Sequence, residues 1–301
     1  MATQHDTTRA FLDQQADAIE RTLQRHEAPA RITGGDVTPR MIHFMAQPAH
    51  QAASIRLESL SREIALALGA PTARITRQGS AVRIDVPRSD PRSVSLAHML
   101  QRLPIGRIPS HTAVLGLADD GAPLLVRLPS LDVQHILIAG GPRTGKTALA
   151  MTIGLSLAAM TKPRDLQIVT IGADLRTLTR LPHAGALTDV WGVLALSDRR
   201  GSQDLSPHVV LLIDRLGNLK ANERGAVDTL LERCALAGVH VIGVTNEQPA
   251  KPWPLMLIAS KAQRAPGAFT ARSFQGDIDF EAAYASADEI DDLIATIKGE
   301  R

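Results

Sequence analysis

The chain has 301 residues, of which 44% are hydrophobic and 21% charged, so it holds enough apolar sequence for one large or two ordinary globular domains. Aromatic residues make up only 3%, which argues against a single-strand nucleic-acid platform that stacks bases on aromatic rings. The net charge of +2, from 33 basic and 31 acidic residues, excludes a globally basic chain, so DNA contact would need a local basic face or several copies around a pore.

The sequence contains no signal for a membrane or for an oxidising compartment. Cys234 is the only cysteine, so no internal disulfide can form. Residues 1–20 contain acids and lack an apolar core, so no secretory signal is expected there. The longest apolar stretch, residues 148–160, includes polar Thr152 and Ser156 and is too short to span a bilayer. We therefore expect a cytoplasmic protein without an intrinsic membrane span.

Residues 1–90 alternate between helical and strand-like patterns, which predicts a small N-terminal α+β domain. The expected elements, in chain order, are a helix over 7–26, strands over 30–35 and 40–46, a helix over 54–70, and paired strands within 73–87. Gly34, Gly35 and Asp36 form the expected turn between the first two strands. The segment PRSDPR, residues 87–92, marks the expected domain boundary.

Residues 91–301 predict an α/β domain, because apolar strands alternate with helices as in a parallel sheet covered on both faces. The expected elements, in chain order, are a helix over 93–103, a hairpin of 112–118 and 123–129, a strand over 135–141, a helix over 145–160, strands over 166–172 and 208–214, a helix over 223–238, a strand over 239–245 and a helix over 287–300.

The segment GGPRTGKT fits the phosphate-binding pattern G-x-x-x-x-G-K-S/T. Glycines let the backbone curl until several N–H groups face one phosphate, and the following helix adds its positive end. Lys146 is expected to reach the β- and γ-phosphates of ATP, and the Thr147 hydroxyl to bind Mg²⁺. The alternative is a glycine-rich turn, but a chance match is expected in only about one in a hundred such chains. The predicted nucleotide-binding residues are Gly140, Gly141, Pro142, Arg143, Thr144, Gly145, Lys146 and Thr147.

Two further strand ends carry polar residues. Asp214 ends the apolar run 209–213. Because ligands lie beyond the carboxyl ends of parallel strands, we expect Asp214 near Thr147 as a second Mg²⁺ ligand. Asn246 follows the next strand and is expected to sense the γ-phosphate. The alternatives are a helix cap for Asp214 and a polar loop for Asn246.

These pieces together resemble the FtsK/SpoIIIE family of DNA-pumping motors. The resemblance implies a RecA-like P-loop ATPase core preceded by a smaller N-terminal motor subdomain. It also implies ATP held between neighbouring subunits of a homo-oligomeric, hexameric ring around double-stranded DNA. Such a ring would multiply a few inward basic groups by symmetry. The matching segments are residues 21–44, 54–70, 82–90, 106–150, 181–190, 236–249 and 280–297.

The chain departs from the family at the hydrolytic site. Arg215 stands where the family has the glutamate that activates water, and Asn246 stands where it has glutamine. A guanidinium cannot accept a proton at neutral pH, so we expect slow hydrolysis unless another acid substitutes. Glu247 is the candidate catalytic base. Arg215 either pairs with a γ-phosphate or turns into solvent.

Three functions are compatible with these features. The first is an ATP-driven DNA translocase. The second is a nucleotide-binding, weakly hydrolytic partner or switch subunit, and the third is such a subunit in a protein-secretion machine. The intact phosphate loop and the retained first domain favour ring assembly, whereas Arg215 and the short segment 191–207 favour the second and third functions.

Overall fold

The structure, a computed structural model, describes residues 2–130, 132–200, 205–233, 237–247, 253–259 and 267–299. The chain divides into two compact units, Met1–Ser93 and Val94–Arg301. The division directly follows the punctuated segment 87–92. Within the described residues, no helix is both long and apolar enough to cross a membrane.

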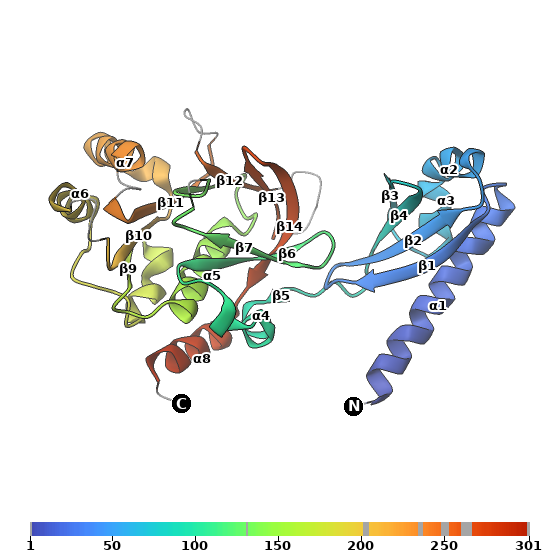
Figure 1. The fold of residues 1–301 in the computed structure, drawn as a ribbon, viewed down its shortest axis with the longest axis horizontal. Helices are drawn as coiled ribbons and strands as arrows, with labels where there is room; N and C mark the ends of the chain where they lie inside the picture. The colour runs from blue at the N-terminus through green and yellow to red at the C-terminus, as the bar shows by residue number, and fades with distance from the viewer. Residues whose placement is uncertain are drawn as a thin grey trace. The chain divides into compact units, whose positions relative to one another are not determined.

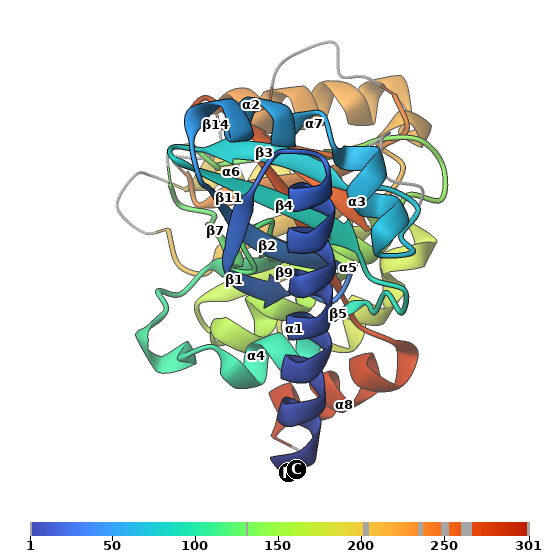
Figure 2. The ribbon, with the colours of Figure 1, turned by 90° about the vertical axis from the view of Figure 1, so that its right-hand side faces the viewer.

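The first unit is an antiparallel sheet with helices on one face (Figures 1 and 2). Its strand order is β1-β2-β4-β3. Ile19 and Leu23 of α1 are buried against Phe44 of β2 and Ile84 of β4, so alternate residues of the strands form the core. The elements are α1 (Ala2–Arg25), β1 (Ala30–Val37), β2 (Met41–Pro48), α2 (Gln51–Glu58), α3 (Ser61–Ala67), β3 (Arg74–Gln78) and β4 (Ala81–Pro87).

The predicted turn at Gly34, Gly35 and Asp36 is wrong. Strand β1 continues through these residues, with a shift of register between Ile32 and Gly34. The chain turns instead between Thr38 and Met41. The Thr38 N–H donates to the Met41 carbonyl at 2.9 Å, and the Thr38 hydroxyl accepts from the Met41 N–H at 3.0 Å. A side chain that bonds the local backbone therefore decides the turn, and the glycines fit a bulge.

The predicted helix over residues 54–70 is also wrong, because the structure has two helices, α2 and α3. Ser59 ends the first one. Its hydroxyl donates to the Arg56 carbonyl at 2.7 Å, and this local bond competes with the helical ladder. The break lets Leu57 and Ile64 both reach the core, where neither side chain is exposed.

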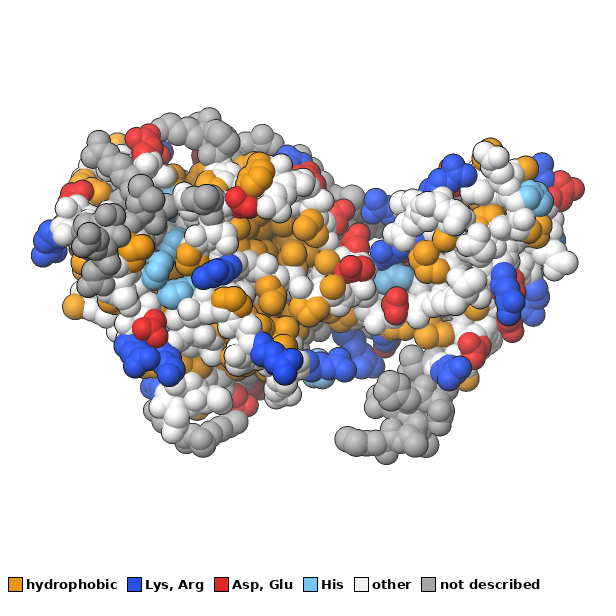
Figure 3. Space-filling model, in the orientation of Figure 1, with side chains coloured by type: hydrophobic (Ala, Val, Ile, Leu, Met, Phe, Trp, Pro, Cys, Tyr) orange, Lys and Arg blue, Asp and Glu red, His pale blue; other side chains and the backbone are white. Residues whose placement is uncertain are grey.

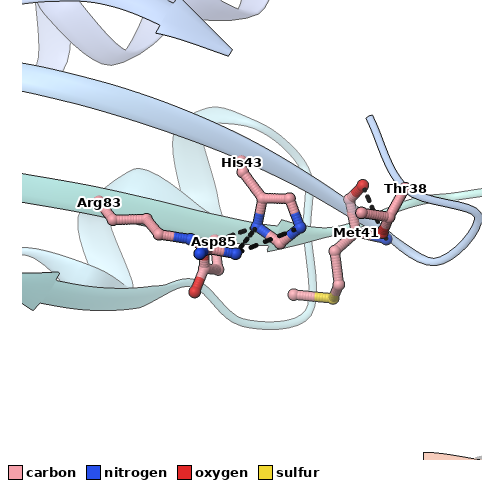
Figure 4. A network of polar contacts seen from close by, with 5 residues as sticks. All are labelled: Thr38, Met41, His43, Arg83 and Asp85. Atoms are coloured by element: carbon pink, nitrogen blue, oxygen red, sulfur yellow. Dashed lines mark hydrogen bonds and ion pairs between the residues drawn. The ribbon is translucent and has the colours of Figure 1, made fainter. Parts of the chain in front are cut away.

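A buried polar network joins β2 to β4 (Figure 4). His43 and Asp85 are cross-strand partners, and the His43 Nδ1 lies 2.7 Å from the Asp85 Oδ1. The Arg83 Nε donates to the same oxygen at 2.7 Å. Burial raises the pKa of Asp85, but the hydrogen bonds from His43 and Arg83 outweigh it and hold that pKa below its usual value. The network satisfies charges that a buried sheet face would otherwise leave unpaired.

The second unit is built on a long mixed sheet of order β7-β6-β14-β13-β12-β8-β11-β10-β9, and β5 pairs with β14. Its elements are β5 (Val94–Ser95), α4 (Leu96–Arg102), η1 (Ile105–Arg107), β6 (Thr112–Ala118), β7 (Pro123–Arg127), β8 (Ile136–Ala139), α5 (Lys146–Met160), β9 (Leu166–Ile171), η2 (Ala173–Arg180), α6 (Val190–Arg199), β10 (His208–Ile213), η3 (Leu216–Asn218), α7 (Ala221–Arg233), β11 (Val239–Thr245), β12 (Leu255–Ala259), β13 (Ala268–Ser273), β14 (Gly276–Tyr284) and α8 (Ala287–Lys298).

The parallel part of this sheet positions the site. Strands β12, β8, β11, β10 and β9 are parallel neighbours in that order. Strand β11 therefore lies between β8, which precedes the phosphate loop, and β10, which precedes Asp214. All three strands end at the same edge, where ligands of open α/β sheets bind.

Helices cover both faces of the parallel strands (Figure 1). On one face, α5 packs on β8 and β10 through residues such as Ile153 and Leu212. On the other face, α6 and α7 pack on β10 and β11 through residues such as Val193 and Leu230. The α/β class predicted for this part of the chain is confirmed, since strands buried on both faces are near-continuously apolar.

The antiparallel extension of the sheet was not predicted. Strands β13 and β14 carry polar and charged residues among their apolar ones, and the first residues of β14 are exposed. The predicted helix over 223–238 corresponds to α7 up to Arg233, and residues 234–236, including Cys234, lie outside the described part of the chain.

Three histidines meet near the amino-terminal ends of β10 and β11. The rings of His111 and His208 have centroids 4.3 Å apart, and those of His208 and His240 are stacked at 5.3 Å. The His240 Nδ1 faces the Gln134 carbonyl at 2.9 Å and must donate to it. The His240 Nε2 lies 3.1 Å from the His208 Nδ1, which donates to it when the His240 ring is neutral.

We expect this unit to lose stability when pH falls from 7.5 to 5.5. Burial and the neighbouring histidines lower the pKa of His208 to about 4 and that of His240 to about 3. Unfolded histidines titrate near 6.5, so the unfolded chain binds more protons below that pH. The contribution of these histidines to the free energy of unfolding is fully present above about pH 6.5. It declines as pH falls toward 4, by about 1.4 kcal/mol per pH unit for each such histidine.

Urea unfolding at the two pH values measures this effect, with His240→Gln as the test variant. The variant should unfold with a smaller pH dependence than the wild type, even where its stability at pH 7.5 is lower. An equal pH dependence in the two proteins would contradict the assignment to the histidine cluster.

Candidate nucleotide site

A glycine-rich loop connects β8 to α5 at the carboxyl edge of the sheet. Gly140 and Gly145 both have positive φ angles, 151° and 94°. A Cβ atom at Gly140 would lie 2.5 Å from the Ala259 Cβ of β12, so a side chain there would collide with the neighbouring strand. Arg143 also has a positive φ of 61°. The loop is therefore tightly curled, as in loops whose backbone N–H groups bind an anion.

Lys146 begins α5 and is buried in the loop, at 6% exposure. Its Nζ donates to the Gly141 carbonyl at 2.5 Å and lies 3.4 Å from the Thr144 hydroxyl. Burial lowers the pKa of Lys146, while the charge of Asp214 raises it. An ammonium held here by neutral oxygens is available to an anion that enters the loop.

Asp214 follows β10 and lies beside the loop. Its Oδ1 accepts a hydrogen bond from the Thr147 hydroxyl at 3.0 Å, and its side chain is nearly buried. Burial raises the pKa of Asp214; the Thr147 bond opposes this, and the nearby Asp174 carboxylate adds to it. A further bond, from the Asp214 N–H to the Ile171 carbonyl at 2.8 Å, ties this strand end to that of β9.

The Thr147 hydroxyl and the Asp214 carboxylate are suitable Mg²⁺ ligands, because this ion prefers oxygen. Among the described residues, no group of three or more His, Cys, Asp or Glu side chains is arranged to hold a metal ion by itself. That suits an ion bound by one or two protein oxygens together with phosphate oxygens and water. Thr147 and Asp214 therefore fit the magnesium that a P-loop uses to shield phosphate charge.

Asn246 and Glu247 lie in the turn after β11, between the phosphate loop and Asp214 in strand order. Both are exposed, and the Glu247 N–H donates to the Thr245 hydroxyl at 3.1 Å. The Glu247 Oε1 lies near Gly217, since a Cβ atom at that glycine would be 3.6 Å from it. Both side chains line the same cavity as Lys146.

This cavity has a volume of about 420 Å³. Three cationic side chains and two carboxylates line it, so its charge suits a polyanion. Gly140, Gly141, Thr144 and Gly145 shape the loop without lining the cavity. The lining residues are Pro142, Arg143, Lys146, Thr147, Asp214, Arg215, Gly217, Asn218, Val244, Thr245, Asn246 and Glu247.

The Arg215 side chain is 65% exposed, but it is paired with two carboxylates. Its Nη2 donates to the Asp174 Oδ2 at 3.0 Å, and its Nε lies 3.6 Å from the Asp214 Oδ2. Sequence reasoning missed Asp174. The available signal was its place just after β9, at the same sheet edge as Asp214.

The curled loop, the buried lysine and the order of parallel strands define a P-loop nucleotide-binding fold of the RecA-like class. Models of known families identify the group within that class. The model "FtsK/SpoIIIE family" matches residues 107–198, and the model "FtsK alpha domain" matches residues 1–88. The chain belongs to the FtsK/SpoIIIE family.

Curated relatives include proteins named DNA translocase FtsK. The protein of Staphylococcus aureus (strain Mu50) is 24% identical over 296 residues, and the alignment covers 83% of this chain and 37% of the relative. The protein of Caldanaerobacter subterraneus subsp. tengcongensis is 25% identical over 276 residues, covering 79% of this chain and 38% of the relative. The chain therefore spans little more than a third of the length of these relatives.

Solved structures share the fold at low identity. ATPases 2 and 3 of Thermomonospora curvata EccC, solved with a signal sequence peptide, match with a TM-score of 0.55 at 20% identity, covering 68% of this chain and 52% of that one. The pCW3 conjugation coupling protein TcpA, solved as a monomer with ATPγS, matches with a TM-score of 0.53 at 12% identity, covering 96% of this chain and all of that one. The RecA-like fold predicted for this chain is confirmed.

Proposed function

We propose that this chain is the nucleotide-binding motor subunit of an oligomeric ring that acts on double-stranded DNA. The nucleotide is ATP, bound with Mg²⁺. Lys146 and the loop amides hold its phosphates, and the Thr147 and Asp214 oxygens bind the metal. Asn246 senses the γ-phosphate from the neighbouring strand end.

The observation that carries this proposal is the 3.0 Å contact between Thr147 and Asp214. These residues are far apart in the sequence and come from different strand–helix connections. Their oxygens meet beside a loop that can hold phosphates, as magnesium-assisted phosphate binding requires. A glycine-rich turn with no ligand would not need the Asp214 carboxylate beside it.

The choice of duplex DNA rests on family membership and on the relatives named as DNA translocases. One subunit has a net charge of only +2. On the face of the second unit shown in Figure 3, Lys and Arg lie singly or in small groups among other side chains. Strong attraction to a polyanion would therefore come from several copies arranged around it.

A second candidate is a weakly hydrolytic partner or switch subunit. Arg215 favours it, because the family glutamate at this position activates water and a guanidinium cannot. Arg215 equally favours a weakly hydrolytic subunit of a protein-secretion machine. Turnover of ATP separates these candidates, since a switch subunit would bind ATP and release little phosphate.

We expect weak, sequence-independent binding of duplex DNA that appears only with the oligomer. Each phosphate contact releases counterions, so affinity should fall steeply as salt rises. Sedimentation with and without Mg-ATPγS would follow assembly, and fluorescence anisotropy over a salt series would follow binding. A protein that stays monomeric with the nucleotide, and retains no DNA at low salt, would contradict the proposal.

A further inference from the structure

The backbone at Arg215 is unusual for a side chain of this size. Its φ and ψ are 56° and 60°, in the left-handed region that non-glycine residues seldom adopt. Its carbonyl accepts from the Asn218 N–H at 2.8 Å, so this conformation starts the short helix η3 directly after Asp214. Strained residues cluster at functional sites, where the surrounding structure holds them. The left-handed backbone of Arg215 therefore suggests that this side chain has a functional role.

Two carboxylates hold the Arg215 side chain at the mouth of the cavity. Asp174, at the start of η2, accepts from its Nη2, and Asp214 faces its Nε. Among the described residues, its Nη1 has no partner within hydrogen-bond distance. The guanidinium is thus anchored on one edge, and the side chain lines the cavity with Lys146.

The remaining edge suits a phosphate oxygen. A guanidinium presents its N–H groups in a planar fork that matches the oxygens of a phosphate. In the nucleotide site proposed above, Asp214 holds the metal that bridges the β- and γ-phosphates, and Arg215 is the next residue and lines the same cavity, so we expect its side chain on the γ-phosphate side. A diphosphate lacks the γ-phosphate that this free edge would contact.

We propose that Arg215 binds the γ-phosphate of ATP within its own subunit, and that Asp174 is the residue that positions it. The proposal rests on the nucleotide site proposed above. It makes the site selective for the triphosphate over the diphosphate. Arg215, at the position where the family has a glutamate, would then distinguish bound ATP from bound ADP.

Calorimetric titration of the full chain with Mg-ATPγS and with Mg-ADP tests this. Arg215→Ala should weaken ATPγS binding about tenfold to a hundredfold, the loss expected for charge-assisted hydrogen bonds. Its affinity for ADP should stay within about twofold, since ADP lacks the contacted group. Arg215→Gly, which tolerates the left-handed backbone, should give the same pattern and guards against a folding defect.

Asp174→Asn tests the positioning role through a double-mutant cycle. In the wild-type background it should lower the ratio of ATPγS to ADP affinity, and in the Arg215→Ala background it should leave that ratio unchanged. Arg180→Ala is the matched control, because Arg180 pairs with Asp291 at 2.6 Å outside the cavity. It should change neither affinity.

Equal losses for ATPγS and ADP in Arg215→Ala, or no loss for either, would overturn the inference while the nucleotide site stands. A ratio that Asp174→Asn lowers equally with and without Arg215 would overturn the positioning role. Wild-type protein that binds neither nucleotide would overturn the proposed function and this inference together.

Discussion

Replacing Lys146 with alanine is expected to weaken the binding of both ATPγS and ADP by about a hundredfold or more, because charge-assisted hydrogen bonds to phosphate are lost. The Gly141 carbonyl and the Thr144 hydroxyl already hold the ammonium in the loop. The Lys146 side chain should therefore lose little conformational entropy when it binds a phosphate. Titration calorimetry with each nucleotide measures the change.

Lys162→Ala is the matched control for this variant. Lys162 is an exposed lysine just past the far end of α5, and its loss removes the same charge from the chain. It should leave both affinities unchanged. Nucleotide affinities of Lys146→Ala within a few fold of the wild type would mean that the loop is a structural turn.

Restoring an acid at position 215 is expected to give the second large effect. Arg215→Glu should raise ATP turnover at saturating nucleotide by about tenfold to a hundredfold, since general-base assistance is worth about 10²–10⁴ when well placed. The variant should also need more ATP for half-maximal rate, because the proposed γ-phosphate contact is removed. Steady-state phosphate release measures both quantities.

Glu247 is the proposed substitute base in the wild type. Glu247→Gln should lower ATP turnover about tenfold in the wild-type background. It should have little effect in Arg215→Glu, where the new carboxylate acts as the general base. Asp228→Asn, at an exposed position of α7, is the control. Wild-type turnover that is already fast and insensitive to Glu247→Gln would contradict the roles of both Arg215 and Glu247.

The features that sequence predicts well here are local or strongly periodic. The phosphate loop needs a strand, a fixed spacing of glycines and a helix, all within consecutive residues. Asp214 was expected near Thr147 because both follow apolar strands of one sheet, and their side chains do lie in contact. The buried parallel strands are near-continuous apolar runs, which made the α/β class evident.

The features that escaped prediction depend on contacts between distant residues or on single side chains. The pairing of Arg215 with Asp174 joins the ends of two neighbouring strands, β10 and β9, and no spacing rule specifies it. The turn at Thr38 and the helix break at Ser59 follow from hydroxyl groups that bond the nearby backbone. Such bonds compete with regular structure by small margins, so pattern alone does not decide them.

The left-handed backbone of Arg215 is likewise invisible in the sequence. A glycine at this position would indicate a positive φ, whereas an arginine does not. Only the structure shows that a strained cation stands beside the two acids of the site. This is the kind of local conflict expected at functional positions.

ATP turnover with and without long linear duplex DNA at low salt tests most directly whether this chain is a DNA-directed motor subunit. A DNA-directed motor should release phosphate slowly by itself and about fivefold or more faster with duplex DNA, a coupling typical of linked sites. Lys146→Ala should show no activity. Turnover that is absent from the wild type, or that duplex DNA leaves unchanged while the protein binds ATP, would contradict a DNA-directed motor.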